Sequence, residues 1–549
     1  MKTKRLWGTL DPFLEPGPIL GRRVANAQFL RFLLEADPYD EYHFFLADRG
    51  LREGLAAQLE RLFPDLWGAG RLVLSDRRRL PEAVAASDFH CFHQSDCILR
   101  QPSLARLRNA VSRRIFPITG TTHSLSYADY PARFLSHLWP GTTARDCIIC
   151  TSRCGLEAVS RQFEALRDGF GLDKERFPAP RLERIPLGLD PDEFVEPSRQ
   201  GREEARLALG LPQGSVLTLV FGRIAHYSKM DLLPLLRAFQ RIFGQGADRN
   251  GMGLVLAGWV DEDDDFPQTL RRLAANIGLS LFLFERPDPE RKAALFEACD
   301  IFASIADNPQ ETFGLTLLEA AAAGLPVVAS DYDGYKDLVE HGTTGWLVPT
   351  TGLAATPEAD LLAPLLPDNQ YHLLLSQGLA VDTGGLAEAI GGLTAQPRLR
   401  LDMGRAGRKR VLEQFSWTEV IRRHVALWDE LNALPVDEER ARAARHPLHP
   451  EFGGLFGHYP TRTLEPGTLL TAGRTGQAFY RGQDFPLIYA GLENLVEEAA
   501  LKTLVFLARK PVTAGELERR LGENAGLSSD RARFLLVWAL KHDLLENAA

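Results

Sequence analysis

The 549-residue chain lacks the features that mark several large classes of protein. It has no apolar run near the roughly 18–20 residues that a membrane-spanning helix needs. Its 63 Lys and Arg residues are outnumbered by 72 Asp and Glu, and the formal net charge of −9 disfavours a dedicated nucleic-acid binder. Asp11, Pro12 and Glu15 interrupt the basic start of the chain, so we expect no secretory signal and a cytoplasmic protein.

Cysteine is also scarce, with six residues in the whole chain, and disulfides are not expected in a large protein without an export signal. Cys147, Cys150 and Cys154 invite a metal-site interpretation, with His90, Cys91 and His93 as further candidate ligands. However, the residues from 146 to 152 have the pattern of a buried strand, in which positions three apart point to opposite faces. We therefore favour buried core thiols over a metal site.

The chain is rich instead in short apolar strands that alternate with helical stretches. This is the pattern of parallel sheets covered on both faces. We expect an α/β fold with two doubly wound Rossmann-like domains, at residues 1–195 and 196–433. The strands expected in the first domain are Arg5–Thr9, Tyr42–Ala47, Arg71–Leu74, Phe89–Phe92, Ile115–Thr119, Cys147–Thr151 and Arg184–Pro186. Those in the second lie within Ser215–Gly222 and at Gly253–Ala257, Leu281–Phe284, Ile301–Ser304, Val327–Ser330 and Gly345–Val348.

Residues 434–549 form a third, mainly helical part. Three helices are expected, at Gly491–Arg509, Ala514–Leu521 and Ser529–Asp543. Thr513 can cap the second helix and Ser528 the third. The spacing resembles a helix-turn-helix or a small winged-helix module. Acidic residues match the basic ones across it, so we favour packing or homodimer formation over DNA binding.

The segment Asp307–Pro326 carries the most information about function. It leaves an apolar strand, passes through a polar loop and enters a short helix near Leu315 that stops at Gly324. Glu311 lies before the helix and Glu319 about one turn inside it. Backbone amides of residues 313–315 can point outward between them. Such a site suits a ligand with anionic oxygens and several hydroxyls, such as a nucleotide-sugar.

These residues resemble a known motif. Glu311, Phe313-Gly-Leu315 and Glu319 are similar to the paired glutamates of the family-four glycosyltransferases, which are retaining enzymes with the GT-B fold. The fragments Asp307–Gly314 and Ser330–Val339 resemble one bacterial branch of that family. The resemblance covers about the first 430 residues. It implies two domains that face each other across a cleft, with a last helix at 416–431 that crosses back to the first domain.

The resemblance also implies the activity. A nucleotide-diphosphate-sugar would donate a hexose-type sugar to an unidentified acceptor (a glycan, a lipid or a small molecule), with retention of configuration, as in polysaccharide biosynthesis. The family implies front-face attack, in which the leaving phosphate takes the acceptor proton and neither glutamate is a covalent nucleophile. Two alternatives stay open: a degenerate GT-B protein that binds nucleotide-sugars or regulates a partner, and a nucleotide-sugar epimerase.

Site residues follow from the resemblance position by position. Arg223 and Lys229 would hold the diphosphate, although one residue more than usual separates them. Glu319 would accept hydrogen bonds from the ribose and Glu311 would contact the sugar. The catalytic set is Glu311, His123 and Arg223. The donor-binding set is Gly21, Arg223, Lys229, Glu311, Thr312, Phe313, Gly314, Leu315 and Glu319.

Three further segments have weaker interpretations. The base is expected near Phe284–Pro287, and Gly17–Gly21 matches the family's glycine-rich acceptor-side loop, with Gly21 as the better match. GT-B enzymes generally use no metal or other cofactor, so the acidic run Asp261–Asp265 is interpreted as a solvated turn. Leu353–Thr383 is longer than the family core needs and has no functional interpretation.

Basic residues gather in the first domain. They are Arg77, Arg78, Arg79, Arg100, Arg106, Arg108, Arg113 and Arg114. One interpretation is a surface for an acidic acceptor or for anionic lipid, which would place the protein peripherally at the inner membrane face. Solvated helix faces explain the same residues.

Overall fold

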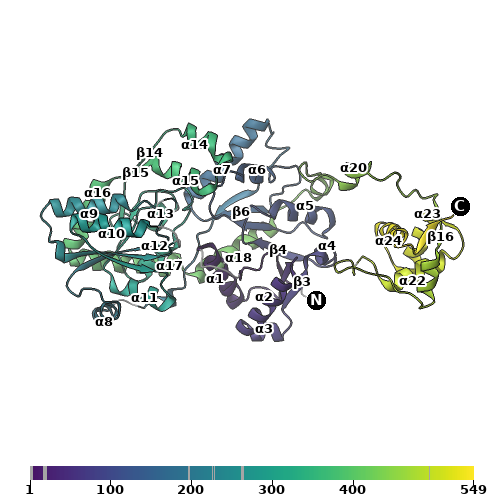
Figure 1. Cartoon of the computed structure of the whole chain (residues 1–549), viewed down its shortest axis with the longest axis horizontal. Helices are drawn as coiled ribbons and strands as arrows, with labels where there is room; N and C mark the ends of the chain where they lie inside the picture. The colour runs from purple at the N-terminus through teal and green to yellow at the C-terminus, as the bar shows by residue number, and fades with distance from the viewer. Residues whose placement is uncertain are drawn as a thin grey trace. The chain divides into compact units, whose positions relative to one another are not determined.

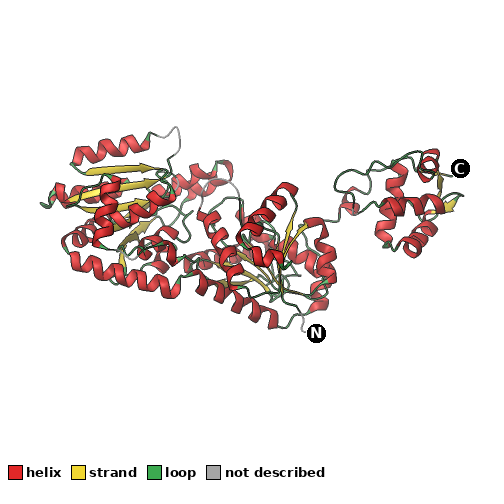
Figure 2. Ribbon diagram, turned by 90° about the horizontal axis from the view of Figure 1, so that it is seen from below, coloured by secondary structure: helices red, strands yellow, loops and turns green. Residues whose placement is uncertain are grey.

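The computed structural model describes residues 4–15, 21–195, 198–225, 227, 229–260, 265–493 and 495–548. The chain divides into two compact units, Met1–Leu448 and His449–Ala549. The first unit contains two parallel sheets, and in the views of Figures 1 and 2 helices flank both. None of the helices within the described ranges is long and apolar enough to cross a membrane.

The first sheet has seven parallel strands in the order β3-β2-β1-β4-β5-β6-β7. These are β1 (Leu6–Thr9), β2 (Glu41–Leu46), β3 (Leu72–Asp76), β4 (Phe89–Gln94), β5 (Ile118–Thr121), β6 (Asp146–Cys150) and β7 (Arg181–Arg184). The expected strands are confirmed, with their ends shifted by a few residues. β5 begins only at Ile118, after Pro117, which has no N–H to donate to a sheet.

Seven helices connect the strands of the first sheet within the described residues. They are α1 (Gly21–Ala36), α2 (Arg49–Leu62), α3 (Pro64–Gly68), α4 (Leu80–Ala86), α5 (Gln101–Val111), α6 (Tyr130–Leu135) and α7 (Arg153–Phe170). The sheet between them is buried on both faces, as the apolar strands predict. Cys147 packs in one core cluster and Cys150 in another, so the two thiols lie on opposite faces of the sheet and are core residues.

The second sheet has six parallel strands in the order β10-β9-β8-β11-β12-β13. They are β8 (Val216–Phe221), β9 (Met252–Gly258), β10 (Ser280–Glu285), β11 (Ile301–Ser304), β12 (Val327–Ser330) and β13 (Gly345–Val348). The accompanying helices are α8 (Arg199–Leu209), α9 (Leu233–Gly244), α10 (Phe266–Ile277), α11 (Pro289–Ala298), α12 (Leu315–Ala322), α13 (Tyr335–Leu338), α16 (Thr383–Ala395) and α17 (Pro397–Gln414). The strand order confirms a doubly wound α/β domain.

An insertion follows β13. Its stem is an antiparallel pair, β14 (Thr350–Gly352) and β15 (Leu379–Val381), and its tip carries α14 (Pro357–Leu362) and α15 (Asp368–Gln377). The hydroxyl of Thr350 donates to the carbonyl of Asp331, 3.1 Å away. The stem is therefore anchored to the loop that follows β12.

A long helix, α18 (Trp417–Ala433), returns to the first sheet where the sequence predicts the crossing helix. Ser416 caps it by accepting a hydrogen bond from the amide of Glu419. Trp417 and Trp428 are fully buried in the core cluster formed by α1 and the first sheet. The indole N–H of Trp428 donates to the Thr119 hydroxyl at 2.9 Å.

The first unit extends beyond residue 433, where the sequence places the domain boundary. α19 (Glu438–Ala443) packs beside α5, and Arg442 donates hydrogen bonds to the carbonyls of Asn109 and Ser112. The His446 ring packs against the ring of Trp139 in a tilted arrangement, with 4.8 Å between the ring centres. These contacts tie the start of the extension to the first sheet.

The second unit combines helices with a small antiparallel sheet, ordered β17-β16-β18. Its elements are α20 (Phe452–Phe456), β16 (Leu469–Ala472), α21 (Arg474–Tyr480), α22 (Glu498–Leu507), β17 (Val512–Thr513), α23 (Ala514–Ala525), α24 (Ser529–Lys541) and β18 (Leu545–Asn547). The predicted caps at Thr513 and Ser528 are confirmed. The helix predicted from Gly491 begins only at Glu498, because the preceding residues form turns.

Candidate functional site

The carboxyl ends of three parallel strands lead into loops that carry predicted site residues. β5 leads to His123 in the first domain. In the second domain, β8 leads to Arg223 and Lys229, and β11 leads to Glu311. Loops at the carboxyl ends of parallel strands are where ligands bind in open α/β sheets.

Lys229 and Glu311 form an ion pair, with 3.2 Å between Nζ and Oε2. The Lys229 ammonium also donates to the Thr316 hydroxyl at 3.3 Å. Both charged side chains are more than four-fifths buried. The extra residue between Arg223 and Lys229 therefore does not keep Lys229 away from the glutamate motif.

The loop after β11, which carries Glu311, forms two further hydrogen bonds with the loop after β8. The amide of Asn308 donates to the carbonyl of Tyr227 at 3.1 Å. The Asp307 carboxylate accepts a hydrogen bond from the backbone N–H of Asp231, also at 3.1 Å. Asp307 and Asn308 are buried, so these bonds form in surroundings of low polarity. Hydrogen bonds thus join the loop after β8 to the loop that carries Glu311.

Arg223 differs from Lys229 in its surroundings. Its side chain is exposed, and it forms no hydrogen bond or ion pair with the residues that the structure describes. A guanidinium with its donors open to solvent is available to bind an anionic ligand such as a diphosphate.

Glu319 lies inside α12 and is buried. Its Oε1 accepts a hydrogen bond from the Lys292 ammonium at 2.6 Å, and Lys292 also lies 5.3 Å from the centre of the Phe221 ring. Its other oxygen, Oε2, is buried and has no hydrogen-bond partner among the described residues. A buried carboxylate oxygen without a partner costs free energy, which a ligand hydroxyl could offset.

The start of α12 is shaped by close packing. Gly314 has φ 107° and precedes the helix, and a Cβ at this position would lie 2.5 Å from the Tyr335 ring. Phe313 is buried in the core of the second domain, and Leu315 packs against it. Because α12 begins at Leu315, the first N–H groups of the helix lack acceptors one turn earlier within it. That of Leu317 already donates to the carbonyl of Gly314 at 3.0 Å, so Leu315 and Thr316 are the residues whose N–H groups could serve a ligand.

His123 lies opposite this helix, on the loop after β5. Its Nε2 is 2.8 Å from the carbonyl oxygen of Ser95, which can only accept, so Nε2 carries the proton. Burial lowers the pKa of His123 to about 4. The ring is therefore neutral at pH 7 and leaves Nδ1 as a hydrogen-bond acceptor.

Two contacts join the His123 loop to the glutamate motif. The Thr312 hydroxyl donates to the carbonyl of His123 at 3.2 Å. The Ser124 hydroxyl donates to the carbonyl of Gln310 at 2.9 Å. The structure thus brings together two predicted residues, His123 and Thr312, that are 189 positions apart in the sequence.

Gly21 is the least informative of the predicted site residues. It is exposed and begins α1, and an added Cβ would meet nothing within 4 Å. Residues 17–20 of the predicted glycine loop lie outside the described residues. Packing within the protein therefore does not require glycine at position 21.

Two carboxylates near the motif were not among the predicted site residues. Burial raises the pKa of both Asp307 and Asp333 to about 7, and the charge of Glu311 contributes to the shift of Asp333. Each has one buried Oδ1 with no hydrogen-bond partner among the described residues. Asp333 also has φ 43°, a conformation that is uncommon outside glycine and concentrates at functional sites. Asp307 stands four residues before Glu311 in the sequence, whereas only the fold brings Asp333 near Glu311.

The loop predicted to bind the base contains Arg286, which has φ 46°. Its guanidinium lies 4.5 Å from the centre of the Trp259 ring and donates to the carbonyl of Val260. Trp259 is 39% exposed, so part of its aromatic surface is open beside this loop. Sequence reasoning missed Trp259 because it follows a different strand, β9.

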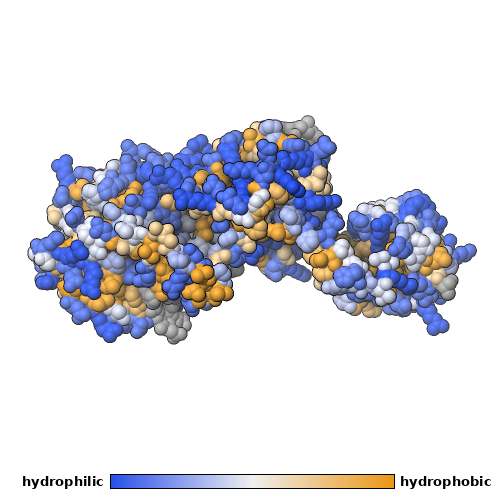
Figure 3. Space-filling view, turned by 90° about the horizontal axis from the view of Figure 1, so that it is seen from above, coloured by the Kyte–Doolittle hydropathy of each residue, from blue (hydrophilic) through white to orange (hydrophobic). Residues whose placement is uncertain are grey.

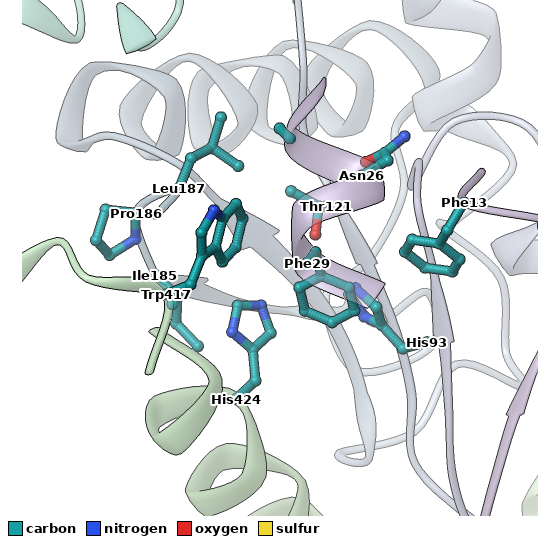
Figure 4. Close-up of a pocket in the computed structure, with 11 residues that line it drawn as sticks. Phe13, Asn26, Phe29, His93, Thr121, Ile185, Pro186, Leu187, Trp417 and His424 are labelled. Atoms are coloured by element: carbon teal, nitrogen blue, oxygen red, sulfur yellow. The ribbon is translucent and has the colours of Figure 1, made fainter. Parts of the chain in front are cut away.

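A small cavity of about 10 Å³ lies between α1, β5 and α18 (Figure 4). It is lined by aromatic and apolar residues with His93, His424 and Asn26, and it has room for about one water. It is too small for a nucleotide-sugar.

No group of His, Cys, Asp or Glu in the described part of the chain could hold a metal ion. Residues 261–264 of the acidic run lie outside that part. The prediction of a solvated turn there stays a prediction.

The arginines of the first domain do not form one open surface. Arg108 is fully buried and makes a bidentate ion pair with Asp146, at 2.7 and 3.0 Å. Arg100 pairs with Asp11 at 2.8 Å, and Arg77 donates to the carbonyls of Phe45 and Leu10. The sequence predicted either a surface for an acidic acceptor or lipid, or a solvated helix face. Both predictions were wrong for Arg108, which is buried and paired within the first domain.

The comparisons with known proteins agree with this geometry. The sequence profile of the family "Glycosyl transferases group 1" matches residues 201–372, a range that contains Arg223, Lys229, Glu311 and Glu319. Residues 201–372 are thus similar to a glycosyl transferases group 1 domain. The D-inositol 3-phosphate glycosyltransferase of Corynebacterium aurimucosum is 32% identical to the chain over 198 residues, and that of Nocardia farcinica 33% identical over 203. Each match covers 36% of this chain, and 45% and 42% of the respective relatives, so the chain spans less than half of their length.

Solved structures extend the likeness to both domains of the first unit. Anabaena HepE, in complex with UDP-glucose, is matched over its whole length by 78% of the chain, with a TM-score of 0.50 and 15% identity. A glycosyltransferase from Rickettsia africae is matched over its whole length by 79% of the chain, with a TM-score of 0.52 and 13% identity. At these identities the likeness concerns the fold alone. The two sheets of the first unit, with their helices, together form the GT-B fold, as predicted.

Proposed function

We propose that the protein is a retaining glycosyltransferase that moves a hexose-type sugar from a nucleotide-diphosphate-sugar to an acceptor. The observation that carries the proposal is the unpartnered, buried Oε2 of Glu319, in a site that also holds Lys229, Glu311 and the open guanidinium of Arg223. A ribose hydroxyl would satisfy Oε2, and the two cations would bind the diphosphate.

In the proposed reaction, the bond between the anomeric carbon and the diphosphate oxygen breaks while an acceptor hydroxyl attacks from the same face. The acceptor proton passes to the leaving phosphate oxygen. Arg223 and Lys229 would stabilise the negative charge that develops on this leaving group. Neutral His123 would accept a hydrogen bond from a sugar hydroxyl through Nδ1, which supports a positioning role within the catalytic set.

UDP is the first nucleotide to test, since Anabaena HepE has been crystallised with UDP-glucose. The acceptor is left open, because the match to the group 1 family lies outside the first sheet. We also propose that the reaction needs no metal ion or other cofactor. Donor binding measured with and without a chelator tests this.

Calorimetric titration of the full chain with UDP-, GDP- and ADP-sugars tests the proposal, together with an assay for slow release of the nucleotide. We expect binding of one nucleotide class and turnover that falls at least tenfold in Arg223→Ala. Arg237→Ala, an exposed arginine of α9, serves as the matched control. Absence of both binding and release would reject the transferase. Binding without release would favour the degenerate binding protein, and an epimerised product would favour the epimerase.

We propose self-association as the role of the second unit. Exposed aromatic side chains such as Phe452, Tyr459 and Phe485 support this. Apolar patches lie among hydrophilic residues on the face of the molecule drawn in Figure 3. Arg531 and Arg533 of α24 pair with Glu497 and Glu518, which leaves them less suited to phosphate binding. Light scattering of the full chain and of a chain ending at Leu448 tests the role, and equal association states would reject it.

A further inference from the structure

The insertion after β13 has no part in the function proposed so far, yet its tip reaches the other domain. Tyr371 and His372, neighbours on α15, both bond to the carbonyl oxygen of Ser126 in the first domain. The distance from His372 Nε2 to that oxygen is 3.1 Å. Both side chains are buried, with exposures of 2% and 0%. The hydroxyl of Tyr371 and the ring N–H of His372 are thus buried against the same acceptor, the carbonyl oxygen of Ser126.

Ser126 lies on the same loop as His123. The loop runs from the end of β5 to the start of α6, and its Tyr127 ring lies 5.8 Å from the ring of His372. On its other side the loop is held by the glutamate motif, through the bonds of Thr312 and Ser124. It is therefore fixed between two parts of the second domain: the donor-binding motif and the insertion.

Hydrogen bonds anchor the insertion at its stem and at its tip. The stem of the insertion is tied to Asp331 next to the motif, and Asp382 closes it through a bond from its amide to the carbonyl of Pro349 at 2.9 Å. Burial lowers the pKa of His372, so its ring is neutral at pH 7 and donates through Nε2 to the carbonyl. A catalytic group must be held within a fraction of an ångström, and supporting residues supply that precision.

We propose that the insertion is a positioning element, in which Tyr371 and His372 hold the Ser126 carbonyl and thereby place His123 against the sugar of the bound donor. This inference rests on the proposed function. It assigns the insertion to recognition of the donor sugar, and the two residues act through His123 without touching the donor themselves.

The test compares affinities for UDP and for UDP-sugar, measured calorimetrically on the full chain. UDP lacks the sugar, so its affinity should be unchanged in Tyr371→Phe. The affinity for UDP-sugar should fall about three- to tenfold, the effect expected from loss of one hydrogen bond. Leu374→Ala, which changes an exposed side chain of the same helix, is the matched control and should bind both ligands as the wild type does. Equal losses for UDP and UDP-sugar would overturn the proposal.

A double-mutant cycle with His123→Ala provides a second measurement. If Tyr371 acts through His123, its substitution should add nothing once His123 is removed. His372→Gln retains a donor and should keep more UDP-sugar affinity than His372→Ala. Fully additive losses would reject the positioning role, and thermal unfolding of each variant separates these outcomes from misfolding. Failure of the wild type to bind any nucleotide-sugar would instead reject the proposed function.

Discussion

The hydroxyl of Thr312 donates a hydrogen bond to the carbonyl of His123, 3.2 Å away, and so joins the glutamate motif of one domain to the first sheet of the other. Thr312 is 8% exposed, so this bond is shielded from water. The Thr312 side chain in the second domain is thus bonded directly to the backbone of His123 in the first domain.

Thr312→Val tests this link. Valine keeps the shape of the side chain but leaves the His123 carbonyl without its donor, so His123 should be placed less accurately. We expect kcat to fall about tenfold, with the affinity for free UDP unchanged. Thr343→Val, at an exposed threonine of the same domain, is the control. A kcat at the wild-type level would show that this bond has no part in catalysis.

Glu319→Gln tests the ribose contact. The amide removes the negative charge next to Lys292 and replaces one acceptor by a donor, so a ribose hydroxyl loses its partner. We expect the Kd of the nucleotide to rise about tenfold or more. Calorimetric titration with UDP and UDP-sugar measures this rise, and both ligands should be affected equally because both contain the ribose. Glu340→Gln, at an exposed position, should bind as the wild type does.

Asp333→Asn tests the buried carboxyl beside the motif. The pKa of Asp333 is raised to about 7, from an unfolded value near 4, so between these values the folded protein holds a proton that the unfolded chain releases. The wild type should therefore lose stability as the pH rises from 4 to 7. Asparagine is neutral throughout and tolerates positive φ. The Tm of the variant relative to the wild type should rise across this window, and a constant difference would contradict the assignment.

Acid should destabilise the first unit through its buried histidines. Burial lowers the pKa of His123, His137 and His424 to about 4, below the unfolded value of 6.5. Between pH 6.5 and 4 the unfolded chain binds protons that the folded protein does not, so stability is complete above pH 6.5 and falls on acidification. For His424 the loss amounts to about 3 kcal/mol. Thermal unfolding from pH 4.5 to 7.5 measures it.

His424→Gln provides the comparison for that experiment. Glutamine does not titrate in this range, so the slope of Tm against pH should be shallower than in the wild type. An identical slope would show that His424 does not contribute to the acid sensitivity of the protein.

The parts of the fold that could be predicted are those with local signals. Strands such as β11 and β12 are short apolar runs between polar loops, and α12 ends at Ala322, two residues before the Gly324 that predicts its C-terminus. The motif residues Glu311 and Glu319 could be named because they share one continuous segment. Their surroundings depend on other segments: Lys292, which pairs with Glu319, comes from α11, and Lys229, which pairs with Glu311, comes from the loop after β8.

The parts that could not be predicted depend on contacts between distant segments. The pKa of Asp333 is raised because the fold buries its carboxyl and brings it near the charge of Glu311, and no local pattern carries that information. The insertion has an ordinary helical sequence, and its relation to Ser126 arises only when both sheets are in place. Arg108 illustrates the reverse error, since its charge indicated a surface and its partner Asp146 is buried.

The return of α18 to the first sheet has a consequence for synthesis on the ribosome. Trp417 and Trp428 complete a core whose other members were made much earlier, and Thr119 receives its indole partner only when residue 428 has emerged. During translation of the second domain, apolar side chains such as Phe29 on α1 therefore lack the cover that Trp417 and Trp428 provide. A chaperone could bind these side chains, and a chain truncated before residue 417 would leave them uncovered permanently.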